Sequence, residues 1–286
     1  MYTVTDMMLP LPIKKIIGVA FLVILGVLSF FFRDNVSSWL AFNDSAPPII
    51  VDTINEPKSS PPPGSVVPPL SGKVPPPSRI VAPSGVVYTG RDPEEVRPVP
   101  EEVKLFSEDQ KHNIYRAIGN HGAAVKENPD YFNGWLQLGL LKKVIGDYIG
   151  ARDAWEYAGV IRPQNSISFS NLGELYWRYL PDFPRAEQNF RIAVANNPMD
   201  VMIYISWSDL YRYSYGEKFN LADDVLIQGL AVSPDHVDLL KTLARVYEAQ
   251  KDYARAIETW ERVLVGEPNN TDVAAVLTAL KQRSVK

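Results

Sequence analysis

The stretch Trp135–Pro163, which reads WLQLGLLKKVIGDYIGARDAWEYAGVIRP, decides the fold because its marker residues return further along the chain. Within it, Tyr148 stands three residues before Ala151, and Pro163 stands twelve residues after that alanine. Later segments carry an aromatic residue, an alanine and a proline at the same spacing: Phe183, Ala186 and Pro198; Phe219, Ala222 and Pro234; and Tyr253, Ala256 and Pro268. A period of about 34 residues indicates an array of one repeated supersecondary unit.

The spacing within one unit predicts a pair of helices. Apolar and small residues recur three and four positions apart, which places them on one helix face. The proline ends the second helix, because it drives the residue before it out of the helical region. This pattern resembles the tetratricopeptide repeat over roughly residues 107–284. The resemblance implies an all-α fold, an α-solenoid of about four helical hairpins within residues 101–286. We expect the hairpins and a final capping helix at residues 132–165, 166–200, 201–236, 237–270 and 271–284.

A half-repeat is expected before the first full hairpin. Ala117 and Pro129 keep the alanine-to-proline spacing of the later copies. Ser107, followed three residues later by Gln110, is typical of a capping box that opens a helix. We therefore expect an N-terminal capping helix that ends before Pro129.

The large aromatic residues of the repeats are expected to form the core. The positions they occupy face inward in the helical hairpin, and small residues elsewhere in each unit allow the helices to approach. A cofactor or sugar site built from them is the alternative that we weigh and do not favour. The residues concerned are Trp135, Trp155, Tyr176, Phe190, Trp207, Tyr211, Tyr247 and Trp260.

Residues 16–33 are expected to form a single transmembrane helix that anchors the chain. The run IIGVAFLVILGVLSFFF holds seventeen residues without a charge, close to the ~20 that span a bilayer as a helix. A cleaved signal peptide is the alternative, but its apolar core is usually shorter, about 7–15 residues. Lys14 and Lys15 precede the run. Positive charge favours the cytoplasmic side, which predicts a short cytoplasmic tail at residues 1–15 and a C-terminal domain across the membrane.

Residues 34–100 are expected to form a disordered, proline-rich linker. Residues 46–100 hold fifteen of the 24 prolines. Proline fixes φ and removes N–H donors, so this segment favours an extended polyproline II conformation over a packed core. A spacer is the preferred interpretation, and a ligand for aromatic-lined grooves is the alternative. The apolar residues between Ile80 and Tyr88 could form a local strand or dock on the repeat domain, and we leave them in the linker.

Neither a catalytic site nor a metal or cofactor site is expected. The chain has no cysteine, and none of its three histidines, His112, His121 and His236, has a partner at a metal-binding spacing. Glycine loops for phosphate and the common nucleophile motifs are missing from the sequence. The net charge is −4, with interspersed signs and no basic stripe, which argues against a nucleic-acid partner.

A groove lined by the first helices of the repeats is the expected binding site. The resemblance implies that these helices form a concave surface that takes an extended or helical segment of a partner. Aromatic residues and arginine are enriched at interface hot spots, which directs attention to the segments around Trp177 and Tyr213. The groove residues that we expect to contact the partner are Asn133, Lys143, Glu174, Trp177, Arg178, Asp209, Arg212, Tyr213, Lys241 and Arg245.

One known use of this groove is not implied here. Chaperone-binding members of the family hold a C-terminal carboxylate with a clamp of lysine, asparagine and arginine. In this chain Leu140 and Ser206 stand where two of the clamp asparagines are expected. The sequence therefore does not predict binding to a chaperone tail.

Together these features predict a membrane-tethered protein–protein adaptor or assembly scaffold that binds a protein or peptide. The layout is similar to that of membrane-tethered repeat proteins of bacterial envelopes, so we expect a single-pass protein with an extracytoplasmic repeat domain. Two alternatives stay open. One is a self-assembling structural envelope protein, and the other is a carbohydrate-binding accessory of envelope biogenesis.

Overall fold

The computed structural model describes residues 80–81 and 85–284 of the chain. The predicted cytoplasmic tail, the predicted transmembrane helix and most of the predicted linker lie outside these residues. Among the helices that are described, none combines the length and the apolar character needed to cross a membrane. The membrane anchor therefore stays a prediction.

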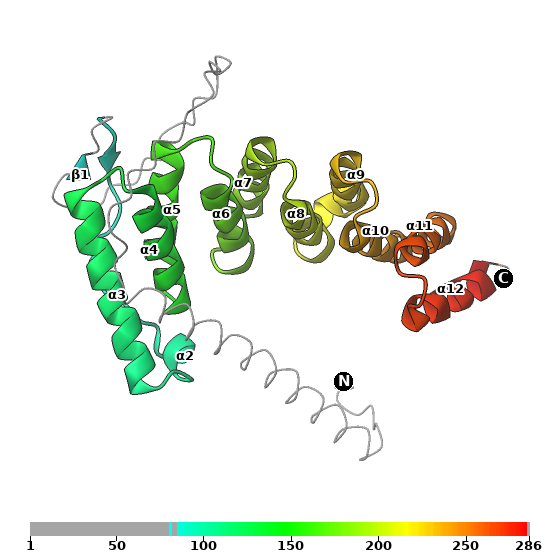
Figure 1. The fold of residues 1–286 in the computed structure, drawn as a ribbon, viewed down its shortest axis with the longest axis horizontal. Coiled ribbons are helices and arrows are strands. Elements are labelled where there is room, and N and C mark those ends of the chain that lie inside the picture. Colours follow the sequence, from blue (N-terminus) through cyan, green and yellow to red (C-terminus); the bar gives the residue numbers. More distant parts are fainter. Residues whose placement is uncertain (1–79, 82–84, 285–286) are drawn as a thin grey trace, which may run out of the picture. The chain divides into compact units, whose positions relative to one another are not determined.

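The described part of the chain is helical apart from two short strands (Figure 1). β1 (Ile80–Val81) pairs antiparallel with β2 (Val87–Tyr88), and one helical turn, α2 (Pro100–Val103), precedes the main array. The array consists of α3 (Glu108–Glu127), α4 (Phe132–Val144), α5 (Tyr148–Ile161), α6 (Ile167–Arg178), α7 (Phe183–Asn196), α8 (Val201–Tyr213), the 3-10 helix η1 (Gly216–Leu221), α9 (Ala222–Val232), α10 (Val237–Ala249), α11 (Tyr253–Gly266) and α12 (Thr271–Ser284).

Each full repeat folds into two packed helices. The pairs are α4 with α5, α6 with α7, α8 with α9, and α10 with α11. Helix α3 packs on α4 as a half-repeat, and α12 packs on α11 as the last helix. The helices follow one another along the array in chain order (Figure 1). This architecture confirms the predicted all-α solenoid of four hairpins with a half-repeat before it and a capping helix after it.

Polar caps start several helices where the sequence indicates them. Ser107 and Gln110 form the predicted capping box. The backbone N–H of Ser107 donates to Oε1 of Gln110, with 2.9 Å between N and O, and the backbone N–H of Gln110 donates to Oγ of Ser107, with 3.2 Å between N and O. Asp147, Asp182 and Asp252 each accept a hydrogen bond from the backbone N–H three residues on, at the starts of α5, α7 and α11. Such caps satisfy N–H groups that the helix itself leaves unpaired. In the third repeat the 3-10 helix η1 lies between the two helices of the hairpin, α8 and α9.

The core is built from the marker residues of the repeats. All eight aromatic residues that the sequence assigns to it have an exposed fraction of 5% or less, which confirms the prediction. Glycine creates the space for two of them. A Cβ added at Gly139 would lie 2.3 Å from Nε1 of Trp155, and one added at Gly173 would lie 2.7 Å from the ring of Phe190. Close helix contact therefore depends on residues without a side chain at these positions.

The predicted linker boundary at residue 100 is wrong, because residues 85–99 pack on the first repeat. We call these residues the strap. The ring of Tyr88, 4% exposed, packs against Trp135 with 4.6 Å between ring centroids and against Tyr157 with 5.4 Å. Its hydroxyl donates a hydrogen bond to the carbonyl of Arg91 at 2.7 Å. The folded domain thus begins by residue 85.

Charged side chains fix the strap to α4 and α5. Nη1 of Arg91 donates to Oδ1 of Asp147 at 2.8 Å. Nζ of Lys142 donates to the carbonyl of Glu95 at 2.7 Å and approaches Oδ2 of Asp147 at 3.5 Å. Lys142 is 2% exposed, and burial lowers the pKa of its amino group although the Asp147 charge opposes this. The prolines do not prevent docking, because these contacts are made by the residues between them.

Candidate partner-binding face

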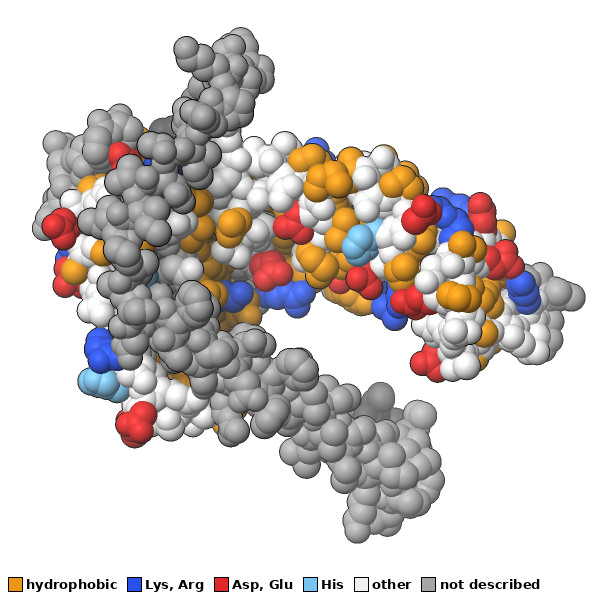
Figure 2. Space-filling model, in the orientation of Figure 1, with side chains coloured by type: hydrophobic (Ala, Val, Ile, Leu, Met, Phe, Trp, Pro, Cys, Tyr) orange, Lys and Arg blue, Asp and Glu red, His pale blue; other side chains and the backbone are white. Residues whose placement is uncertain are grey.

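The first helices of the repeats, α4, α6, α8 and α10, carry the predicted binding residues. Helix α6 contacts α8 directly, and α8 contacts α10, so α6, α8 and α10 form a continuous row. We use the name inner face for the groove residues predicted above, all of which lie on these four helices. Figure 2 shows acidic and basic side chains gathered along the lower edge of the middle of the array.

Three arginines of the inner face act electrostatically on one carboxylate, that of Asp209. Asp209 lies on α8, and the arginines come from three successive first helices: Arg178 from α6, Arg212 from α8 and Arg245 from α10. Burial raises the pKa of the Asp209 carboxyl above its ordinary value, and the positive charges of the three arginines oppose that rise. We call these three arginines the arginine triad.

Aromatic rings hold two members of the arginine triad. The guanidinium carbon of Arg178 lies 3.7 Å from the ring centroid of Trp177, and that of Arg212 lies 4.8 Å from the ring centroid of Tyr213. The Trp177 ring is itself fixed, because its Nε1 donates to Oγ of Ser214 at 2.8 Å. A planar guanidinium stacked on a ring keeps its N–H donors free at its edge.

The arginine triad differs from the neighbouring lysines in its ion pairs. Nζ of Lys241 lies 2.7 Å from Oε1 of Glu267, and Nζ of Lys143 lies 3.8 Å from Oε2 of Glu174. Among the described residues, no carboxylate lies within 4.0 Å of any guanidinium nitrogen of the triad. The two lysines are therefore partly neutralised within the domain, whereas the triad keeps net positive charge.

The other predicted residues occupy different positions on the inner face. Asn133 is exposed near the start of α4, and Tyr213, 65% exposed, stands at the end of α8. Trp177 is 7% exposed, so the structure places it beneath Arg178 rather than at the surface. Its ring contacts the guanidinium group of Arg178. The sequence did not show whether Trp177 is buried or exposed, because Trp177 directly follows the core residue Tyr176.

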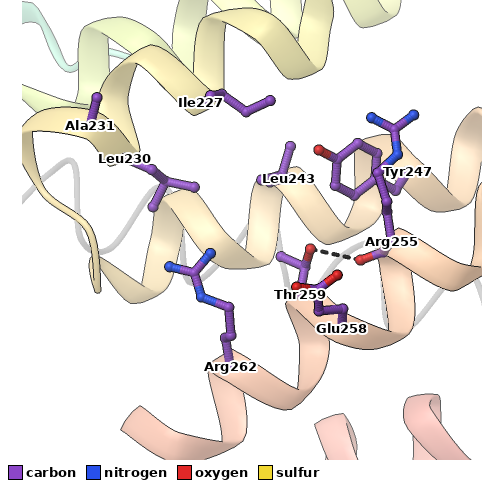
Figure 3. Close-up of a pocket in the computed structure, with 9 residues that line it drawn as sticks. All are labelled: Ile227, Leu230, Ala231, Leu243, Tyr247, Arg255, Glu258, Thr259 and Arg262. Carbon is purple, nitrogen blue, oxygen red and sulfur yellow. Dashed lines mark hydrogen bonds between the residues drawn. The ribbon is translucent and has the colours of Figure 1, made fainter.

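A cavity between α9, α10 and α11 was not anticipated from the sequence (Figure 3). Its volume is about 370 Å³, and Leu230 and Leu243 contribute apolar surface to it. Its arginines are already bound: Arg255 donates to Asp252 at 2.7 Å, and Arg262 donates to the Pro234 carbonyl at 2.8 Å. No sequence pattern predicts this cavity, because the cavity depends on the spacing between helices of neighbouring repeats.

The part of the chain that the structure describes contains no candidate metal site. Within it, no group of three or more His, Asp or Glu side chains is arranged to hold a metal ion. His121 is half-buried on α3, and burial lowers the pKa of its imidazole.

Comparison with known proteins places the last repeats in a family. Residues 217–280, which run from η1 into α12, match the family described as tetratricopeptide repeat. A search of curated proteins found no match.

The chain is also similar to several solved structures. MamA is 17% identical, with 62% of this chain and 99% of that chain covered and a TM-score of 0.48. YrrB, described as a TPR protein with an unusual peptide-binding site, is 16% identical, with 59% and 85% covered and a TM-score of 0.45. A tetratricopeptide repeat protein from Parabacteroides merdae is 16% identical, with 63% and 71% covered and a TM-score of 0.47.

Proposed function

We propose that this chain, whose last repeats match the tetratricopeptide-repeat family, is a membrane-tethered adaptor that holds a segment of a partner protein on its inner face. Stacked repeats create an extended surface on which a partner chain can make many contacts at once. The observation that carries the proposal is the arginine triad, whose charge is not neutralised by an ion pair among the described residues. The proposal assigns the protein no catalytic step.

The tether of this proposal is the uncharged run within residues 16–33, with the repeat domain on the extracytoplasmic side of a bacterial envelope. Its support is the length of that run and the lysines at positions 14 and 15. Cysteine substitution of exposed Val265, followed by labelling of intact cells with a membrane-impermeant maleimide, tests the orientation. The chain has no cysteine of its own, so the label reports that one position. Labelling only after cell lysis would contradict the proposed orientation.

Site-specific photocrosslinking tests the binding face. A photoreactive amino acid replaces Asn133 or Tyr213 on the inner face, and Val160 or Ile227 in matched controls. All four side chains are exposed, but the controls lie on the second helices α5 and α9. We expect the inner positions to crosslink one discrete protein in intact cells and the controls to leave that protein uncrosslinked. Equal crosslinking from both sets, or none from the inner set, would overturn the proposal.

A further inference from the structure

Building on the proposed function, we infer that the inner face takes an extended acidic segment of a partner protein, with one carboxylate for each member of the arginine triad. The chemistry of the face points to this class of ligand. Guanidinium groups form planar, paired hydrogen bonds with carboxylates. The triad offers three such groups from three successive first helices, α6, α8 and α10.

Two side chains of the triad are held in position before an external anion binds. Stacking on Trp177 and Tyr213 holds Arg178 and Arg212 at 3.7 and 4.8 Å from the ring centroids. Arginine side chains lose rotamer freedom when they bind, and a side chain that is already held loses less. Asp209, on whose carboxyl all three arginines act, forms no ion pair within 4.0 Å with a described residue. The structure thus leaves the guanidinium edges to a ligand.

The spacing of the helices that carry the triad favours an extended ligand. Packed helices lie about 8–10 Å apart, and α8 contacts both α6 and α10. A polyproline II segment has three residues per turn and rises about 3.1 Å per residue, so every third side chain points to the same side about 9 Å further on. A segment with Asp or Glu at every third residue therefore matches one carboxylate to each helix. An α-helix would need its acidic residues about six apart to cover the same distance.

Acidic residues within the row argue for a peptide rather than a nucleic acid. Asp209 lies three residues before Arg212 on α8, and Glu174 lies four residues before Arg178 on α6. The closely spaced phosphates of a nucleic acid would come near these carboxylates and be repelled by them. The separate side-chain carboxylates of a peptide can instead lie between Asp209 and Glu174. Asp209 also competes with the ligand, because it lowers the positive potential that the ligand meets. Removing its charge should therefore strengthen binding.

Fluorescence anisotropy with defined peptides tests the inference. The full-length chain in non-ionic detergent is titrated into a labelled peptide of three Glu-Pro-Pro triplets, which favours polyproline II. A Gln-Pro-Pro peptide and a peptide of equal composition with its three glutamates adjacent are the ligand controls. A single-stranded DNA oligonucleotide tests the alternative polyanion. The protein variants are Arg178→Gln, Arg212→Gln and Asp209→Asn, with Arg262→Gln on α11 as the matched arginine control.

We expect the Glu-Pro-Pro peptide to bind more tightly than both control peptides and more tightly than DNA. Each arginine substitution in the triad should weaken binding about fivefold, as for a charged pair of about 1 kcal/mol. Asp209→Asn should strengthen binding, and Arg262→Gln should leave it unchanged. Indifference to the glutamates, indifference to the triad, or tighter binding of DNA would each overturn the inference. The inner face could crosslink a protein although the Glu-Pro-Pro peptide does not bind as expected. That outcome would support the adaptor proposal and overturn only the inference of an acidic ligand.

Discussion

Replacing Tyr88 with alanine tests whether the strap belongs to the folded domain. The Tyr88 ring is buried against Trp135 and Tyr157, and removing a buried aromatic side chain typically costs about 3–5 kcal/mol. The strap can detach as a unit, so the cost cannot exceed the free energy with which the strap docks. We therefore expect a loss at the low end of the range, about 3 kcal/mol. For a domain of this size it lowers Tm by about 6–12 °C.

Two matched variants separate the parts of this effect. Tyr88→Phe keeps the ring and removes only the hydrogen bond to the Arg91 carbonyl, so it should cost about 1 kcal/mol. Val87→Ala changes a neighbouring strap residue that is 39% exposed and should change the free energy of unfolding by less than about 0.5 kcal/mol. Urea unfolding followed by circular dichroism measures all three variants.

Hydrogen exchange locates the effect. Repeats contact only their neighbours, so the loss of protection should be concentrated in α4 and α5 and be small in α10 and α11. The reasoning would be refuted if the Tyr88→Ala unfolding curve superposed on that of Val87→Ala. It would also be refuted if the loss of protection were uniform along the array.

Three further substitutions test the packing and the charges of the array. Gly139→Ala places a Cβ 2.3 Å from Nε1 of Trp155 and should destabilise the domain by about 1–3 kcal/mol in thermal unfolding. Burial alone would raise the pKa of Glu187, but hydrogen bonds led by that from Lys218 hold it below its ordinary value. Glu187→Gln should therefore lower Tm near pH 7 by an amount that disappears as the pH falls below the lowered carboxyl pKa. Burial raises the pKa of Asp209, so its ionised form is disfavoured in the folded state. Asp209→Asn should raise Tm at pH 7, and the gain should vanish below about pH 4.

Each of these variants has a control within the same chain. Gly119 lies within α3, where an added Cβ meets no atom within 4 Å, so Gly119→Ala should stabilise by about 0.5–1 kcal/mol. Glu217→Gln and Asp224→Asn make the same charge changes at exposed positions and should have little effect on Tm at either pH. Equal effects of test and control variants would show that burial and contacts do not govern the stability at these positions.

The repeat core could be predicted because its rules are local. The twelve-residue interval from Ala151 to Pro163, repeated along the chain, follows from the helix period and from the chain turn at proline. The same interval identified the inward positions, so the burial of Trp155 and its equivalents was predictable. The strap was not, because proline composition indicates what a segment cannot form by itself and says nothing of what it can dock on. Tyr88 acquires its role only from the pocket between Trp135 and Tyr157.

For the inner face, too, some features follow from the sequence and others only from the tertiary structure. By itself the sequence determined that this is a helical repeat array, and it determined which side chains lie on the first helices, because both follow from periodicity. Only the tertiary structure decided that Trp177 lies beneath Arg178 and that all three arginines of the triad act on the Asp209 carboxyl. Members of the triad are about one repeat apart in sequence, and their approach depends on how each repeat stacks on the next. The array is therefore set by local spacing, and its charge pattern is set by the contact between repeats.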